Sequence, residues 1–237
     1  MFKYLVPLLF AAHASAHDVD AILKKADAFR LAEGSSQVET LVQTFKDGQP
    51  DKERRYQVLV KPGRKSLVLF RSPGETGQKV LMSGDDLWML LPGSARPIRI
   101  TPLQKLLGDA ATGDIATMTL AGDYTGDVVR EIDIDGVPCI ELDLKAVRKS
   151  ISYQRIVLHV AKRDFHPVHA DLFAESNRRL KQARFTFDAR NQVNKMTLVD
   201  EVQTKRETVV TTLSSKPRKF GDELFNPMYL SRSDVAQ

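Results

Sequence analysis

Three consecutive segments, SYQRIVLHVAK (152–162), PVHADLFAES (167–176) and RLKQARFTFD (179–188), decide the fold of this chain. Apolar and polar residues alternate along each segment, which is the pattern of β-strands with one buried face and one solvated face. The connections between them are too short for a helix. The sequence therefore predicts an antiparallel meander here.

The register of these strands follows from keeping apolar residues opposite one another. A three-residue loop between the first two strands places Leu158 opposite Ala170, whereas a two-residue loop would pair apolar with charged residues. A two-residue turn before the third strand then predicts Leu172 opposite Ala183 and Ala170 opposite Phe185. We expect one continuous apolar face across the three strands.

Similar segments extend over most of the chain and are separated by turn sequences such as Asp47-Gly48 and Asp135-Gly136. Successive strands with short turns indicate a mainly β protein rather than alternating strands and helices. The remaining predicted strands are 36–47, 53–61, 64–71, 78–83, 86–91, 96–100, 124–134, 137–145, 193–200 and 205–214.

Helical spacing interrupts this pattern twice. From Asp18 to Gly34 the apolar residues recur on one face, with Asp18 as an N-cap, which predicts an N-terminal helix. Between residues 102 and 123 the apolar spacing again turns helical. We expect one or two short helices there, lying over the mouth of the sheet as a lid.

The first sixteen residues are typical of a secretory signal. Lys3 gives a positive start, a short apolar run follows, and Ala14-Ser15-Ala16 is an A-x-A cleavage site. The apolar run is far shorter than the ~20 residues that span a bilayer. We expect a signal peptide over 1–16 and one mature domain over 17–237, a length common for a single large β domain.

Composition excludes several functions. The formal net charge is +5 and the isoelectric point is near 9.3, yet Lys and Arg alternate with Asp and Glu without a dense block or an aromatic platform. This argues against a nucleic-acid partner and suits a solvated surface near anionic membranes. The lone cysteine, Cys139, cannot form an internal disulfide.

No catalytic motif is present, and we predict that the chain is not an enzyme and needs no cofactor. His159 and His169 should face each other across a hairpin with Asp171 on the same face, which is a weak zinc candidate. A solvent-exposed outer face near a turn would also account for these three polar residues. We assign no metal. Ser94 and Ser152 lack the context of a nucleophile.

Several stretches resemble the outer-membrane lipoprotein-sorting proteins, the LolA-like group. They are the run 65–73, the stretch 77–82, and DDLWMLLP (85–92) with Arg96. The helical insert and the ending DELF (222–225) with Tyr229-Leu230 continue the likeness in order.

The resemblance implies a LolA/LolB-like half-barrel, a curved antiparallel sheet with an N-terminal helix and helical lid segments over an apolar cavity. It also implies a periplasmic carrier or chaperone for acylated lipoprotein or lipid cargo. Its partners would be an inner-membrane ABC- or RND-type transporter and an outer-membrane acceptor. Transfer of the functional arginine of that group to Arg54, Arg55 or Arg71 stays open.

Alternating apolar residues, together with the helical insert, predict the wall of an acyl-chain cavity. An acyl chain needs such a pocket, because each CH₂ group that is buried away from water gains about 0.8 kcal/mol. A non-enzymatic adaptor of an envelope export system and a periplasmic lipid-ester hydrolase remain alternative functions. The predicted cavity residues are Tyr56, Val58, Val60, Leu67, Leu69, Met82, Trp88, Leu90, Ile98, Leu158, Leu172 and Phe185, and the predicted lid residues are Leu103, Leu106, Leu107 and Met118.

Overall fold

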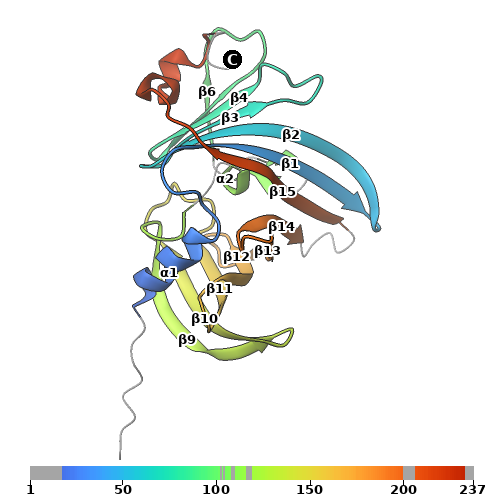
Figure 1. Ribbon diagram of the computed structural model, residues 1–237. Coiled ribbons are helices and arrows are strands. Elements are labelled where there is room, and N and C mark those ends of the chain that lie inside the picture. Colours follow the sequence, from blue (N-terminus) through green and yellow to red (C-terminus); the bar gives the residue numbers. More distant parts are fainter. Residues whose placement is uncertain are drawn as a thin grey trace, which may run out of the picture.

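A computed structural model describes residues 18–101, 103, 105–107, 110–115, 119–199 and 206–232. The predicted signal peptide lies outside this range. One antiparallel sheet dominates the molecule and bends strongly, so that its two halves enclose a concave inner face (Figure 1). Among the described helices, none combines the length and apolarity needed to cross a membrane.

The sheet contains thirteen strands, in the spatial order β6-β5-β4-β3-β2-β1-β15-β14-β13-β12-β11-β10-β9. All thirteen strands predicted from the sequence are found in it. They are β1 (Ser36–Lys46), β2 (Gln49–Lys61), β3 (Lys65–Phe70), β4 (Lys79–Ser83), β5 (Asp86–Leu90), β6 (Ile98–Ile100), β9 (Tyr124–Ile134), β10 (Val137–Ala146), β11 (Arg155–Ala161), β12 (Pro167–Phe173), β13 (Arg179–Phe187), β14 (Val193–Val199) and β15 (Arg206–Pro217).

Two consecutive meanders build the sheet, one from β1 to β6 and one from β9 to β14. Tight turns such as Asp135-Gly136, where both residues have positive φ (52° and 82°), join neighbouring strands. The last strand, β15, pairs with β1 on one side and β14 on the other and so joins the two halves.

The register of β11 and β12 confirms the prediction that Leu158 lies opposite Ala170. The predicted register of β12 and β13 is wrong by two residues, since Ala170 pairs with Ala183 and Leu172 with Lys181. A longer turn and a bulge after Leu172 replace the expected two-residue turn. Because the shift is an even number, every side chain keeps its face, and Lys181 lies on the inner face with Ala183 and Phe185 in either register.

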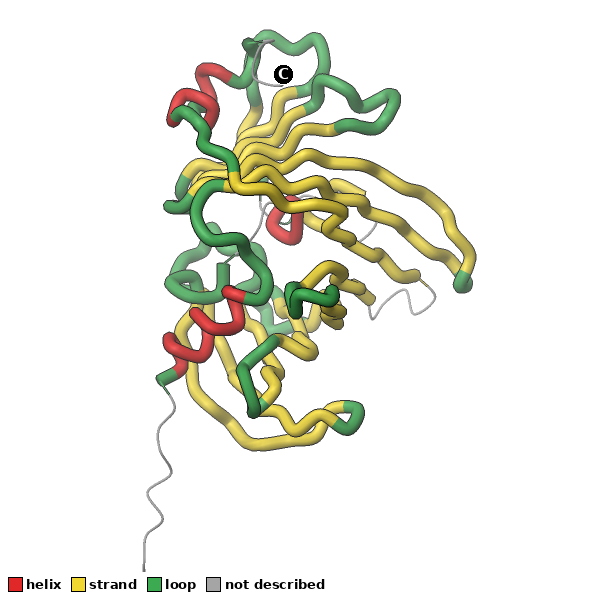
Figure 2. Tube along the Cα trace, in the orientation of Figure 1, coloured by secondary structure: helices red, strands yellow, loops and turns green. Residues whose placement is uncertain are grey.

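Helix α1 (Val19–Ala28) begins as predicted, with the Asp18 side chain accepting a hydrogen bond from the Asp20 amide (3.1 Å). It ends earlier than expected, at Phe29. Ile22 and Leu23 pack into the core on the inner side of the sheet. Figure 2 shows α1 lying beside the half of the sheet that contains β9 to β11.

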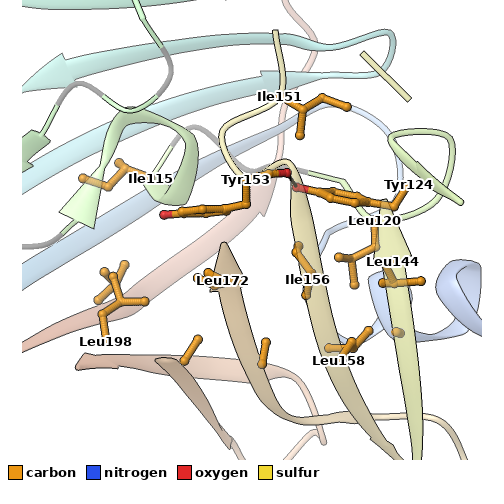
Figure 3. Packing of buried hydrophobic residues seen from close by; sticks show 14 of the residues in the cluster. Ile115, Leu120, Tyr124, Leu144, Ile151, Tyr153, Ile156, Leu158, Leu172 and Leu198 are labelled. Carbon is orange, nitrogen blue, oxygen red and sulfur yellow. Dashed lines mark hydrogen bonds between the residues drawn. The ribbon is translucent and has the colours of Figure 1, made fainter. Parts of the chain in front are cut away.

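Buried residues from both halves form the main core on the inner face. Figure 3 shows Tyr153 lying near Ile115, Ile156 and Leu172 in this cluster. The hydroxyl of Tyr124 donates to the backbone carbonyl of Tyr153 (2.9 Å). This packing occupies much of the deep part of the concave space.

The lid prediction is partly wrong. Lys105–Leu107 is a strand, β7, that pairs with β8 (Ala110–Ala111), rather than a helix. A four-residue helix, α2 (Thr112–Ile115), follows, and Ile115 is buried in the core. Leu103 is exposed, Leu106 and Leu107 belong to β7, and Met118 lies outside the described residues.

The C-terminal segment covers the convex outer face of β3 to β5 with two short 3₁₀ helices, η1 (Asp222–Phe225) and η2 (Pro227–Tyr229). Lys79 donates to the backbone carbonyls of Leu230 and Arg232 (both 2.9 Å) and holds this segment in place. The resulting outer cluster consists of Leu59, Leu67, Leu69, Leu81, Leu90, Phe225 and Leu230.

Candidate cavity for an apolar ligand

A cavity of about 600 Å³, here called the mouth cavity, opens at one end of the concave face. The loop after α1, the β2–β3 turn, the β13–β14 turn and the end of β15 surround it. Its apolar wall includes Val38, Val60, Met82, Val193 and Leu213. This volume lies within the range of about 300–1,000 Å³ that is usual for small-molecule sites.

Two smaller cavities, of about 80 and 30 Å³, continue inward from the mouth cavity. Arg30 lines all three cavities, and Phe185 lines both inner ones. Ile115 borders the first inner cavity, whereas Leu158 and Leu172 border the second. The inner face therefore has neighbouring hollows that share lining residues instead of a uniformly filled core.

Six of the predicted cavity residues line these hollows. Tyr56 lies on the same face but packs edge-to-face against Phe70 in the core, and Ile98 is 54% exposed on the edge strand β6. The six that line a hollow are Val58, Val60, Met82, Leu158, Leu172 and Phe185.

The structure places the other four predicted cavity residues on the wrong face for this role. Leu67, Leu69, Trp88 and Leu90 point outward and pack with the C-terminal segment in or against the outer cluster. Their strands are buried on both faces, so the apolar run 67–70 shows no alternation from which the inner side could be identified.

A buried polar cluster links α2 to the opposite half of the sheet. The carboxylate of Asp114 accepts hydrogen bonds from the Tyr153 hydroxyl (2.8 Å) and the Ala111 amide (2.9 Å), and it pairs with Lys181 at 2.8 Å. The side chains of Lys181 and Asp114 are 7% and 3% exposed. Sequence reasoning missed this pair, although strict alternation places Lys181 on the same face as Ala183.

A second buried carboxylate, Asp27, fixes the loop that borders the mouth cavity. It pairs with Arg30 (3.0 Å) and accepts hydrogen bonds from the amides of Leu120 (2.8 Å) and Ala121 (2.9 Å). Burial raises the pKa of Asp27 above its usual range, and Arg30 and the two amides offset this effect only in part. The contacts hold the end of α1, and with it Arg30, against the residues that precede β9.

Basic residues surround the rest of the mouth. Arg64 pairs with Asp123 and with Asp85 (3.3 Å), and Arg190 pairs with Asp188 (2.9 Å) in the β13–β14 turn. Lys61 and Lys65 both contact the single carboxylate of Asp222, at 2.9 Å each. These two lysines hold the pKa of Asp222 down to about 2.

The three arginines considered for the group's functional role lie away from these hollows. Arg54 pairs with Glu75 (2.6 Å), and the side chain of Arg71 contacts Gln57 on the outer face. The backbone amide of Arg55 donates to Ser72 (2.8 Å). None of the three contributes to the cavity linings described above.

The histidine pair lies opposite each other as predicted, on the outer face of β11 and β12. His159 is buried rather than wet, and its Nε2 lies 3.1 Å from Glu141. Burial favours a higher pKa for Glu141, but hydrogen bonds from Arg130 and His159 hold that pKa below its usual value. Asp171 pairs with Arg179 (3.0 Å), and no group of described residues is arranged to hold a metal ion.

A protein-family model whose description reads "Uncharacterized protein" matches residues 63–232. No curated protein matches the chain. Two solved structures share its fold at low identity. An outer membrane lipoprotein-sorting protein domain from Vibrio parahaemolyticus is 19% identical, covers 90% of this chain and 98% of its own, and has a TM-score of 0.70. A DUF1329 family protein from Desulfovibrio piger is 20% identical, covers 87% and 95%, and has a TM-score of 0.69.

A more similar structure is that of a LolA superfamily protein from Nitrosomonas europaea. It is 33% identical to this chain, the alignment covers 87% of this chain and 96% of that one, and the TM-score is 0.81. The chain belongs to the LolA superfamily.

Proposed function

We propose that this protein is a non-enzymatic periplasmic carrier that binds acyl chains of lipoproteins or lipids in the hollows of its inner face. In this proposal the signal peptide is cleaved near Ala16, and residues 17–237 form one carrier domain. The cargo would pass from an inner-membrane transporter towards an acceptor at the outer membrane.

The observation that carries the proposal is the set of neighbouring cavities on the concave face of a LolA-superfamily sheet. A fold solved for a lipoprotein-sorting domain is bent in the same way. The mouth cavity has an apolar wall, which includes Val60 and Met82, and leads towards Phe185, Leu158 and Leu172. Hydrocarbon entering at the mouth would therefore meet Val60, Met82 and Phe185 along its path, with the polar groups of Arg30 and Asp114 beside them.

The energetics favour such a ligand. Each CH₂ group transferred from water gains about 0.8 kcal/mol, so ten buried methylenes gain about 8 kcal/mol to set against the cost of immobilising the ligand and ordering its chain. A mouth cavity of about 600 Å³ suits one ligand of drug-like size. Larger cargo would require the inner hollows to open, and α2, whose Asp114 lines both of them, is an element that would have to move.

The test uses laurdan, an uncharged naphthalene dye with a lauroyl chain. We expect saturable binding, seen as a blue shift in emission, and displacement by 1-palmitoylglycerol. Val60→Phe places an aromatic ring in the mouth cavity and should weaken binding by about tenfold or more. Val193→Phe, at another wall position, provides a second test if Val60→Phe does not fold.

The matched control is Val129→Phe, the same substitution at a residue on β9 that is 53% exposed. It should leave laurdan binding unchanged. A wild-type protein that shows no saturable binding would refute the carrier proposal. Mass spectrometry of lipids that copurify with the native protein would identify the cargo.

A further inference from the structure

We infer that the mouth cavity selects an amphiphile with an anionic oxygen head group, a phosphodiester or a carboxylate, over an uncharged one with the same tail. This inference depends on the proposed acyl binding and adds the chemical class of the head group.

The lining of the mouth cavity is strongly asymmetric in charge. Asp188 is the one carboxylate among the described residues that line it. Three arginines, Arg30, Arg64 and Arg190, line the same cavity. Lys61 and Lys65 also border it, but their ammonium groups lie against Asp222 of η1, on the outer side of the sheet. The carboxylates that pair with Arg30 and Arg64, on Asp27, Asp85 and Asp123, are absent from that lining within the described chain.

This arrangement puts positive charge next to the cavity and most of the compensating negative charge behind it. Asp27 also accepts hydrogen bonds from two backbone amides, so its charge is shared between those donors and Arg30. An anion at the mouth would consequently meet a positive potential.

The position of the cations relative to the apolar wall sets the orientation of the ligand. Arg30 borders the mouth cavity and both inner hollows, while Leu158 and Phe185 lie only in the inner ones. A tail directed inward would leave its head at the mouth, beside Arg30, Arg64 and Arg190. Guanidinium groups match two oxygens of a phosphodiester or carboxylate, and partial exclusion of water strengthens that attraction.

The experiment compares ligands that share one palmitoyl chain and differ in the head group. The competitors of laurdan are 1-palmitoylglycerol, which is uncharged, lysophosphatidylglycerol and palmitate, which are anionic, and lysophosphatidylcholine, which is zwitterionic, all below their micelle concentrations. Inorganic phosphate is added as a separate arm. We expect the better anionic ligand to bind about tenfold more tightly than 1-palmitoylglycerol, with an advantage that shrinks as salt rises.

Two variants that each remove one positive charge test whether the preference for anionic ligands arises at the mouth cavity. Arg190→Gln should lower the affinity for the preferred anionic ligand by about fivefold, and Arg30→Gln should do so by at least as much. Arg184→Gln is the matched control, because Arg184 is exposed on the outer face of β13 and away from the cavity. It should leave the preference for the anionic ligand intact.

The outcomes separate this inference from the proposed function. Equal affinity for 1-palmitoylglycerol and both anionic ligands would overturn the inference and leave acyl binding established. Failure of every palmitoyl ligand to displace laurdan would count against the carrier proposal itself. Inorganic phosphate that binds as tightly as the anionic amphiphiles would show a free-anion site and would also overturn the inference.

Discussion

The outer face of the sheet is built differently in its two halves. On β3 and β4 it carries Leu67 and Leu81, both fully buried beneath the C-terminal segment. On β11 to β13 it carries His159, His169 and Arg184, of which Arg184 is exposed. In one half the sheet thus lies between the inner core and the C-terminal segment, whereas in the other half its outer face is polar. Only in the second does alternation of residue type identify the inner face.

The largest expected effect concerns the covered half. Leu81→Ala removes a fully buried side chain from the outer cluster and should lower the free energy of unfolding by about 2–5 kcal/mol. Thr186→Ala, at an exposed position on the outer face of β13, should change it by less than about 0.5 kcal/mol. Urea denaturation measures both. Similar losses in the two variants would show that the halves do not differ in this way.

An intermediate effect is expected where the covering segment is attached. Lys79→Met keeps an unbranched side chain of similar length but removes the ammonium group that donates to the carbonyls of Leu230 and Arg232. We expect a loss of about 1–3 kcal/mol. Amide hydrogen exchange should speed up in residues 220–232, with β11 to β13 unchanged. Protection that stays the same in the C-terminal segment would contradict this anchoring role.

The smallest effect is a pH dependence on the polar half. Burial, together with His159, Arg184 and Arg179, lowers the pKa of His169 despite the opposing charge of Asp171. The unfolded state then binds a proton at higher pH than the folded state, so stability should fall as the pH drops below about 6.5.

Thermal denaturation at pH 7.5 and 5.5 tests this dependence. The melting temperature of the wild type should be lower at pH 5.5, and His169→Gln should reduce the difference. A variant with the full wild-type pH dependence would exclude His169 as its source.

Much of the fold could be predicted from the sequence. All thirteen strands of the main sheet and the helix start at Asp18 follow from residue periodicity and turn residues. The register between β12 and β13 could not be predicted. A bulge between Leu172 and Phe173 shifts the pairing of the two strands, and the pattern of apolar and polar residues gives no sign of it. The β7–β8 pair was mistaken for a helix, because apolar spacing over so few residues fits both elements.

The candidate site was predictable only in part, for a physical reason. Val58, Val60, Leu158, Leu172 and Phe185 lie on strands where the pattern of residues, or the register to such a strand, identifies the inner side. No such signal distinguishes Leu67 from Val68, since both are buried on opposite faces. The cations of the mouth were also missed, because Arg30, Arg64 and Arg190 come from loops that only the bent sheet brings together.

The position of β15 has a consequence for how the chain assembles. Each meander can form from hairpins between neighbouring segments, but the two are joined only when β15, near the end of the chain, pairs with β1 near its beginning. Contacts between such distant segments form slowly. During synthesis β1 must therefore wait with an unpaired edge until β15 is made, and this edge is where a chaperone or premature self-association would act first.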